Sequence, residues 1–473
     1  MSTALVWFRR DLRLHDNPAL SQAVAAHARV IPVYIHAPQE EAPWVPGGAS
    51  RWWLHHSLAA LDTALRQRHS QLLLRQGDSL AVLRALIRET GATAVYWNRL
   101  YEPQLIARDK TIKAALREEG LEVQSDNAAL LFKPWTLCKD DGNPYQVFTP
   151  FWKACTRLSP PPPPLPAPVA LKAPPFWPES LPLAALRLLP RILWYQGMAE
   201  TWQPGEEAAL DQLAHFCTYL LDSYPQTRDL PGVDGVSRLS PRLHFGEISP
   251  RQIWIAVSNQ IQGDPLQHKA SATYLRELGW REFAHYVLYH WPHTAEQPMQ
   301  ERFAAYPWRQ DYDELLSAWQ QGRTGIPLVD AGMRELWHTG WMHNRARLVT
   351  ASWLTKNCRI PWQEGARWFW DTLVDADLAN NTLGWQWTAG CGTDAAPYFR
   401  IFNPVRQGER FDPDGTYVRR WLPELAAVPT PCLHQPWTLP AAQRPLFDYP
   451  QPLVDLDASR AEALQGYERI RNR

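Results

Sequence analysis

The first 130 residues alternate short apolar runs with longer amphipathic stretches. Apolar runs with the length of buried strands lie at 4–8, 30–35, 72–75, 94–97 and 121–125. Helical patterns separate them, for example at 50–68, 79–90 and 103–119. Because strand–helix alternation builds parallel sheets, the sequence predicts an α/β domain with a doubly wound parallel sheet.

The first helix of this domain is expected to begin at Asp16-Asn17-Pro18, since a capping side chain followed by proline is typical of a helix start. The sequence that follows the first apolar run contains no GxGxxG motif. A dinucleotide-binding Rossmann site is therefore not supported.

A change of composition separates this part from the rest of the chain. Prolines crowd the stretch from Ser159 to about Gln203, and proline is excluded from regular helix and sheet interiors. Beyond it the patterns are helical, at 206–222, 250–261, 270–291, 312–321, 329–339, 344–356 and 363–373. We therefore expect an α/β domain at 1–132, a proline-rich connector at 133–204 and an all-α domain at 205–473.

Charge and cysteine content limit the possible functions. Lys and Arg together number 48, as do Asp and Glu, so a nucleic-acid site would be a local basic groove. The six cysteines form no CxxC pair, which disfavours a zinc site or a disulfide framework. No apolar run reaches the roughly 18 residues of a membrane span, and the N-terminus does not read as a signal peptide. We expect a cytoplasmic monomer without a membrane or obligate protein partner.

Three segments combine polar and aromatic residues in ways that suggest a binding site. Residues 374–404 gather aspartates, asparagines and tryptophans without a nucleophile–base pair, which suits a flat redox-active ligand better than hydrolysis. Asp375 and Asp377 lack a third ligand nearby, so no metal site is predicted. The loop 224–240 has the glycines and hydroxyls of a phosphate cradle, although most such loops are only turns.

Two helical faces complete this set. Tyr274, Glu277 and Arg281 share one face of 272–285, with Trp280 adjacent. They form either an i,i+4 ion pair beside buried aromatics or a surface for a flat polar ligand. In 341–348, Trp341, Asn344, Arg345 and Leu348 recur at helical spacing, where a solvated arginine face is the simpler alternative.

Taken in order, these segments resemble the DNA photolyase and cryptochrome family over nearly the whole chain. Within the family the chain resembles class I cyclobutane pyrimidine dimer photolyases. The stretches RWWLHHSL (51–58) and VFTPFWK (147–153) resemble a branch near the plant cryptochromes. The resemblance implies light-driven repair of UV-damaged DNA, by electron transfer from excited reduced FAD to a flipped-out pyrimidine dimer.

The resemblance also implies which residues contact the cofactor. The expected FAD contacts are Tyr224, Val236, Ser237, Arg238, Leu239, Ser240, Tyr274, Arg281, Trp341, Asp375, Ala376, Asp377 and Asn380. Val236 and Tyr274 depart from the family pattern, which usually has Thr and Trp at these positions. Asn380 would sit opposite flavin N5, where plant cryptochromes typically have Asp and animal ones Cys, so it favours a photolyase.

DNA contacts and catalytic roles are implied in the same way. The expected DNA contacts are Arg228, Glu277, Trp280, Arg281, Asn344, Arg345 and Gln407. Glu277 would hydrogen-bond the dimerised bases, while Trp280 and Trp387 would stack on them. Asn344 and Arg345 would touch the lesion or the flavin, and Arg347 would serve a phosphate or a salt bridge. Leu348 stands where dimer-specific photolyases commonly have Met.

Electron supply and antenna are the last implied features. Trp385, Trp362 and Trp308 match the family's tryptophan triad, which runs from flavin to surface. The expected antenna is methenyltetrahydrofolate, although Gln104 and Leu105 replace the Asn–Glu pair that anchors the pterin in the best-known relatives. A deazaflavin or an empty site are the alternatives. The rival functions are a cryptochrome-type photoreceptor, a (6-4) photolyase, which the Asn344-Arg345 pair disfavours, and a light-independent DNA-binding scaffold.

Overall fold

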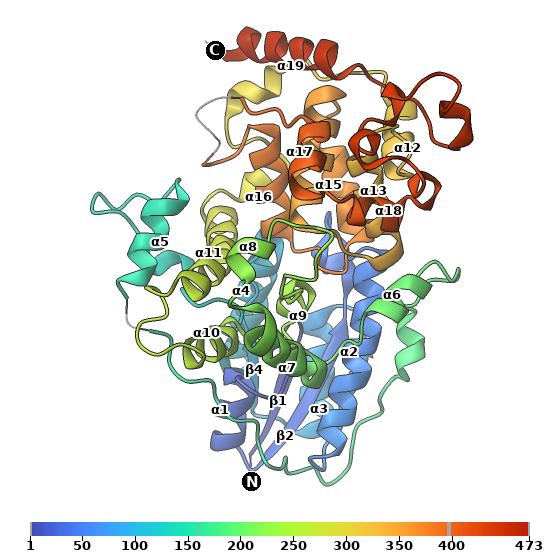
Figure 1. Cartoon of the computed structure of the whole chain (residues 1–473). Coiled ribbons are helices and arrows are strands. Elements are labelled where there is room, and N and C mark those ends of the chain that lie inside the picture. The colour runs from blue at the N-terminus through green and yellow to red at the C-terminus, as the bar shows by residue number, and fades with distance from the viewer. Residues whose placement is uncertain (1, 159, 395–398, 472–473) are drawn as a thin grey trace. The chain divides into compact units, whose positions relative to one another are not determined.

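The structure is a computed structural model that describes residues 2–158, 160–394 and 399–471. Residues 395–398 of the segment 374–404, and Ser159 at the start of the connector, lie outside the described residues. Figure 1 shows the whole chain coloured from the N-terminus to the C-terminus.

A single parallel sheet forms from the five apolar runs expected to be strands. The strands are β1 (Thr3–Phe8), β2 (Arg29–His36), β3 (Leu73–Gln76), β4 (Ala94–Asn98) and β5 (Glu122–Asp126). Their order is β3-β2-β1-β4-β5 and every pairing is parallel, with Leu5 opposite both Ile31 and Val95. Central strands of such a sheet are covered on both faces, which explains why their sequences are continuously apolar. The α/β prediction is confirmed.

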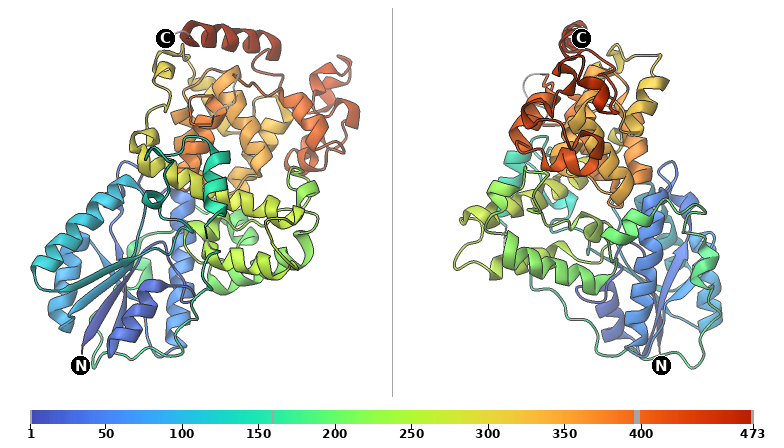
Figure 2. Two further views of the ribbon diagram at one scale, coloured as in Figure 1. Left: turned by 90° about the vertical axis from the view of Figure 1, so that its left-hand side faces the viewer. Right: turned by 45° about the vertical axis from the view of Figure 1, so that its right-hand side comes forward.

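Helices cover both faces of this sheet, as Figure 2 shows. On one face, Leu5 and Trp7 of β1 form a buried core with α3 (Ser79–Thr90) and α4 (Pro103–Glu118). This core includes Leu83 and Leu116, which come from the amphipathic stretches between the strands. The apolar side of each amphipathic stretch therefore indicates which side of the helix packs on the sheet.

The chain folds into two compact units, each described by itself. Unit 1 comprises residues 1–193, 202–222 and 237–292, and unit 2 comprises residues 194–201, 223–236 and 293–473. Besides the sheet, α3 and α4, unit 1 contains α1 (Pro18–Ala26), α2 (Gly48–Arg66), α5 (Phe148–Thr156), α7 (Glu206–His215), α9 (Ser240–His244), α10 (Pro250–Asn259) and α11 (Lys269–His290). The domain boundaries expected from composition divide the chain differently and stay a prediction.

The secondary structure of unit 2 consists of helices, and its described residues include no β-strand. Its helices are α6 (Gln196–Thr201), α8 (Tyr224–Thr227), α12 (Asp313–Gln320), α13 (Pro327–Thr339), α14 (Asn344–Ser352), α15 (Trp362–Thr372), α16 (Leu378–Ala389), α17 (Pro404–Phe411), α18 (Thr416–Trp421) and α19 (Leu456–Arg471). Short 3-10 turns of unit 1 lie at 38–41, 134–136 and 183–186, and the turn at 292–295 includes the boundary between the units in the sequence. Those of unit 2 lie at 301–305, 423–425, 430–432, 436–438 and 444–446. With the α/β sheet of unit 1, this confirms the predicted pairing of an α/β part with a helical part.

Two helices continue into a wider, π-helical turn. The turn Phe216–Leu220 follows α7, and the turn Trp353–Asn357 follows α14. The sequence predicts uninterrupted helices at 206–222 and 344–356, because the hydrophobic period does not distinguish one π turn from the α turns around it. Within the described residues, each helix is too short or too polar to cross a bilayer.

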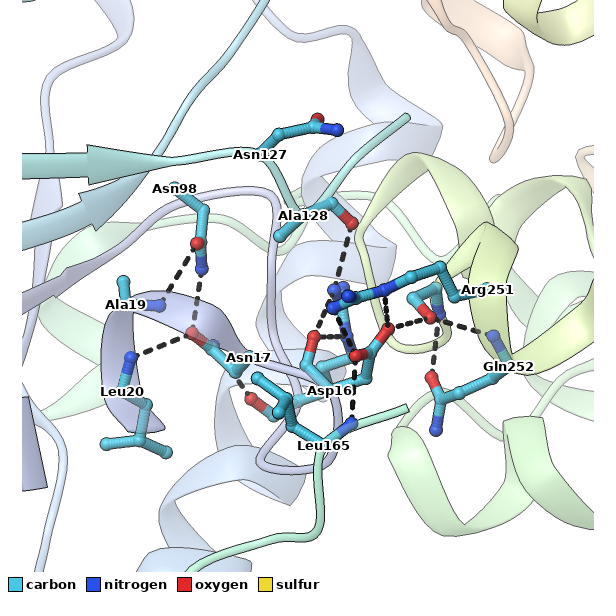
Figure 3. Close-up of polar contacts among 12 residues, drawn as sticks. Asp16, Asn17, Ala19, Leu20, Asn98, Asn127, Ala128, Leu165, Arg251 and Gln252 are labelled. Carbon is cyan, nitrogen blue, oxygen red and sulfur yellow. Dashed lines mark hydrogen bonds and ion pairs between the residues drawn. The ribbon is translucent and has the colours of Figure 1, made fainter. Parts of the chain in front are cut away.

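The start of α1 is held by a buried polar network, drawn in Figure 3. Asn17 is the N-cap, since its Oδ1 accepts the Leu20 N–H at 3.1 Å, and Pro18 opens the helix as expected. Asp16 has a left-handed backbone (φ 49°) and a fully buried carboxylate. This carboxylate accepts hydrogen bonds from Arg251 of α10 and from the Leu165 N–H of the proline-rich connector. Three distant segments of unit 1 thereby meet at one carboxylate.

Candidate functional site

The residues expected to contact FAD and DNA are divided between the two units. In unit 1 they are Ser237, Arg238, Leu239, Ser240, Tyr274, Glu277, Trp280 and Arg281. In unit 2 they are Tyr224, Arg228, Val236, Trp341, Asn344, Arg345, Asp375, Ala376, Asp377, Asn380, Trp387 and Gln407.

In unit 1, helix α11 and the residues from 237 onward are joined through Tyr274. The Tyr274 hydroxyl donates to Ser237 Oγ at 3.0 Å, and its ring contacts Phe216 with centroids 4.4 Å apart. Burial raises the pKa of Tyr274, so the phenol stays protonated. The Ser237 carbonyl accepts a hydrogen bond from Gln212 at 2.7 Å. Two expected FAD contacts, Tyr274 and Ser237, therefore form one fixed pair.

The next residues of this loop differ in what they present. Arg238 has a left-handed backbone (φ 50°), Leu239 is buried, and Ser240 is exposed at the start of α9. The buried Leu239 side chain anchors the loop, and the residues on either side of it carry a guanidinium and a hydroxyl group. Hydroxyl and guanidinium donors are the groups that bind a diphosphate, so the donor set of 237–240 fits the cofactor expected there.

Trp280 carries a contact that the sequence did not reveal. Phe148, the first residue of α5, stacks on its indole with ring centroids 3.8 Å apart and planes 8° from parallel. One face of the Trp280 ring is thus covered from within unit 1. The signal available in the sequence was weak, because VFTPFWK shows several aromatics without indicating which ring they meet.

The face of α11 is oriented by contacts to the segment after β5. Arg281 donates to the Ala129 carbonyl at 2.8 Å. Its neighbour Glu282 is buried and accepts the N–H groups of Leu131 and Phe132 at 2.9 and 3.0 Å. Burial raises the pKa of Glu282, while these N–H donors favour its charged form. A flavin contact by Arg281 stays a prediction, as does the role of Glu277.

In unit 2, the structure brings the 341–348 face beside the start of the 374–404 segment. The Val374 N–H donates to the Gly340 carbonyl at 2.7 Å. Arg347 donates to both carboxylate oxygens of Asp375, at 3.1 and 2.8 Å, and its guanidinium lies 5.9 Å from the Trp341 ring centroid. Of the two roles considered for Arg347, the structure shows the salt bridge.

Asn380 is held at the first turn of α16 by the helix cap. Asp377 Oδ1 accepts the Asn380 backbone N–H at 2.8 Å and its side-chain Nδ2 at 2.7 Å. With the amide nitrogen committed to Asp377, the Asn380 side chain has one fixed orientation. The position that resemblance assigns to flavin N5 therefore carries an anchored amide rather than a carboxylate or a thiol.

The segments that carry the three expected electron-transfer tryptophans contact one another in unit 2. Trp385 is buried and packs on Gly365, one helical turn after Trp362 at the start of α15. Arg309, next to Trp308, donates its backbone N–H to the Arg359 carbonyl at 2.8 Å, three residues before Trp362. Trp385 and Trp362 are buried, whereas Trp308 is partly exposed. This order, from buried to exposed, is the one expected of a chain that ends at the surface.

Arg345 also has partners that sequence reasoning missed. Its guanidinium pairs with Asp229 at 2.7 Å and lies 4.1 Å from the ring centroid of Phe411 on α17. Gln407 lies one helical turn before Phe411, so it shares that face of α17. Arg228 contacts the Tyr224 ring at 5.3 Å. Asp229 and Phe411 are 116 and 66 residues from Arg345 in the sequence, so no local pattern indicated the contact.

The antenna residues considered in the sequence are engaged within unit 1. Gln104 donates to the Glu41 carbonyl at 3.4 Å, and Leu105 is only 1 % exposed in the core beneath α4. Leu105 therefore offers no surface to a pterin. Among the described residues, His, Cys, Asp and Glu side chains form no group of three arranged for a metal ion.

Two family models match the chain. One, described as DNA photolyase, matches residues 4–169, and the other, described as the FAD binding domain of DNA photolyase, matches residues 274–469. The first spans the parallel sheet, and the second spans most of α11 and the described helices beyond it. Both expected contact groups therefore include residues inside the matched FAD-binding region.

Curated relatives include both photolyases and cryptochromes. The chain is 44 % identical to the deoxyribodipyrimidine photo-lyase of Agrobacterium fabrum, over 99 % of the chain and 98 % of the relative. It is 40 % identical to cryptochrome-2 of Arabidopsis thaliana, over 99 % of the chain and 79 % of the relative. It is also 40 % identical to the Escherichia coli deoxyribodipyrimidine photo-lyase, over 100 % and 99 %.

Solved structures show the same division. A bacterial class III photolyase from Agrobacterium tumefaciens matches with a TM-score of 0.95 and 44 % identity, covering 100 % of this chain and 98 % of that one. A Synechocystis cryptochrome matches with a TM-score of 0.89 and 31 % identity, covering 98 % and 99 %. The class I assignment expected from the motifs is not supported by these matches.

Proposed function

The chain belongs to the DNA photolyase and cryptochrome family and carries its FAD-binding domain, and from this premise we propose that it repairs cyclobutane pyrimidine dimers in DNA. The branch that we propose is that of the class III photolyase rather than class I, on the similarity to the Agrobacterium structure. The observation that carries the proposal is the anchored amide of Asn380, because names of relatives alone leave photolyase and cryptochrome equally open.

In this proposal, FAD in its reduced form supplies a light-driven electron that splits the cyclobutane ring and then returns. The residues of the chain bind and orient. Ser237, Arg238 and Ser240 would hold the diphosphate end of the cofactor, and Asp375, Asp377 and Asn380 would hold its isoalloxazine end. The Arg347–Asp375 salt bridge fixes the position of one of these carboxylates. Asn380 presents its amide oxygen because its nitrogen is bonded to Asp377.

The same proposal gives the dimer its own contacts. Damage weakens stacking and pairing, which lowers the cost of extruding the dimer from the duplex. Glu277 accepts or donates a hydrogen bond at the base edges, and Asn344 lies at the lesion. Trp387 and Trp280 stack on the extruded bases. Since Phe148 covers one face of Trp280, only the opposite face is left for the dimer.

The test is illumination of reduced protein mixed with an oligonucleotide that contains a thymine dimer. We expect dimer loss in blue light and none in the dark, measured by chromatography of the strand. The rival function is a cryptochrome-type photoreceptor, which the similarity to Arabidopsis cryptochrome-2 favours. Persistence of the dimers while flavin photoreduction proceeds normally would decide for that rival.

Trp385, Trp362 and Trp308 have a separate proposed role, the reduction of oxidised flavin from the surface. We expect Trp362→Phe to slow photoreduction about tenfold or more, because phenylalanine is much harder to oxidise than indole, and to spare repair by pre-reduced enzyme. The matched control is Trp370→Phe, another buried indole of α15 outside the path. Equal loss of both activities in Trp362→Phe, or equal slowing in the control, would contradict the role.

For the antenna we propose methenyltetrahydrofolate held by residues other than Leu105, since that side chain is buried. The absorbance and fluorescence of protein purified with its bound chromophores identify the antenna directly. A deazaflavin spectrum, or flavin alone, would contradict this part of the proposal without affecting the repair reaction.

A further inference from the structure

We propose that Asp229 competes with DNA for the Arg345 guanidinium, which it occupies until a phosphate of a distorted strand displaces it. This inference rests on the proposed function, in which Arg345 contacts the damaged strand. Asp229 itself has been given no role by the motifs or by the family resemblance.

Arg345 is held at three points in the protein without DNA. His343 caps α14 and accepts the Arg345 backbone N–H on its Nδ1 at 3.1 Å. The guanidinium donates to Asp229 Oδ1 at 2.7 Å and lies over the Phe411 ring at 4.1 Å. Only 15 % of the Arg345 side chain is exposed, so most of the guanidinium is withdrawn from solvent.

The hydrogen-bonding capacity of Arg345 is not used up by these contacts. Among the described residues, no acceptor lies within bonding distance of its buried Nε. The buried Oε1 of Gln407, on the same α17 face as Phe411, likewise has no donor among the described residues. A second guanidinium, that of Arg410, lies 5.0 Å from the same Phe411 ring. Two positive groups thus lie against one ring, and Asp229 pairs with one of them, Arg345.

The solvent exposure of the Arg345–Asp229 pair decides how easily the pair opens. Asp229 is 40 % exposed, so water and salt screen its attraction for Arg345, and such pairs contribute little to stability. A phosphate, which accepts hydrogen bonds as a carboxylate does, can replace Asp229 at small cost. A straight duplex does not reach a guanidinium that is withdrawn and paired. A strand from which a dimer has been extruded is bent and brings a phosphate closer, so the exchange occurs there.

The experiment measures binding in the dark to two otherwise identical duplexes, one with a thymine dimer and one intact, at several salt concentrations. In Asp229→Asn, Arg345 is released in both cases. Affinity for intact duplex rises about fivefold, the upper end expected for loss of an exposed pair. Because one more phosphate is neutralised, the salt dependence of intact-duplex binding steepens by about 0.9. Affinity for the dimer duplex rises by a similar factor, because the wild-type protein must break the pair to bind it, and its salt dependence stays the same.

Three variants control this measurement. Asp229→Glu keeps the carboxylate and restores both wild-type affinities. Glu424→Gln removes the same charge from another ion pair of unit 2, that with Arg334 at 2.7 Å, and leaves both affinities unchanged. In Arg345→Gln, dimer binding weakens, and adding Asp229→Asn to it has no further effect.

Weaker binding of both duplexes by Asp229→Asn would overturn the inference and make Asp229 a structural support of the loop. Dimer binding unaffected by Arg345→Gln would overturn it as well, and this holds even if Asp229→Asn fails to fold. The proposed function fails differently, when wild-type protein leaves dimers intact under illumination. Selective dark binding without repair would refute the function and leave the role of Asp229 standing.

Discussion

Helix α14 carries two arginines two residues apart, and each holds an aspartate from a distant segment, but at different depths. Arg347 binds both oxygens of Asp375, whose side chain is 4 % exposed. Arg345 binds one oxygen of Asp229, whose side chain is 40 % exposed. Residues at i and i+2 point to different sides of a helix, so α14 directs the two cations to different partners, and it is the aspartates that differ in depth.

The difference shows how one sequence motif serves two purposes. The deep pair cannot open without separating a buried carboxylate from its cation, which is costly, so it acts as a permanent part of the fold. The shallow pair loses less when it opens, because the exposed Asp229 carboxylate regains water. We infer that the deep pair fixes the 374–377 backbone, while the shallow pair is available for exchange with a ligand.

The largest expected effect is on the deep pair. Asp375→Asn removes the carboxylate and leaves Arg347 with a neutral partner, and we expect the free energy of unfolding to fall by about 3 kcal/mol, the lower end for a broken buried pair. The lower end applies because the Arg347 side chain is 25 % exposed and reaches some water. Urea unfolding measures this, with Asp229→Asn as the matched variant, whose change should stay within about 0.5 kcal/mol. Equal losses of unfolding free energy in Asp375→Asn and Asp229→Asn would show that the two ion pairs do not differ in their contribution to stability.

A smaller effect is expected when each arginine is replaced by lysine. Arg347 uses Nε for the Met342 carbonyl at 2.7 Å and Nη2 for Asp375, and a lysine has one nitrogen for both. We expect Arg347→Lys to cost about 2 kcal/mol, the size of one lost charge-assisted hydrogen bond, and Arg345→Lys to cost less than about 0.5 kcal/mol. Urea unfolding of both variants is the measurement. A costly Arg345→Lys would show that Arg345 is part of the fold rather than a displaceable group.

How far the sequence predicts these features depends on whether the signal is local. The three central strands are almost wholly apolar, and each of the five strands was predicted within two residues of its bounds. The cap of α1 was also predicted, because Asn17 and Pro18 are adjacent in the sequence. Burial and capping are properties of short segments, so they can be read from one sequence.

Contacts between distant segments could not be predicted in this way. The sequence left Arg347 with two possible roles, because its spacing to Asp375 says nothing about which atoms meet. Phe148 on Trp280, and Asp229 and Phe411 on Arg345, join segments between 66 and 132 residues apart. The family resemblance indicates which ligand a residue is expected to contact. It does not indicate the neighbouring side chains that orient that residue. Those neighbours decide whether an arginine is displaceable.

The smallest expected effect is the salt dependence of the two pairs in the protein without DNA. Double-mutant cycles over Arg345/Asp229 and Arg347/Asp375 isolate the coupling within each pair. At low salt we expect about 0.5 kcal/mol for the shallow pair and more than about 1 kcal/mol for the deep one. At about 1 M salt the screening length falls to about 3 Å, so the shallow coupling should vanish while the deep one persists, since solvent ions do not enter around Asp375. A shallow coupling that survives high salt would mean that Phe411 shields the pair from solvent. Asp229 would then need more than a nearby phosphate to release Arg345.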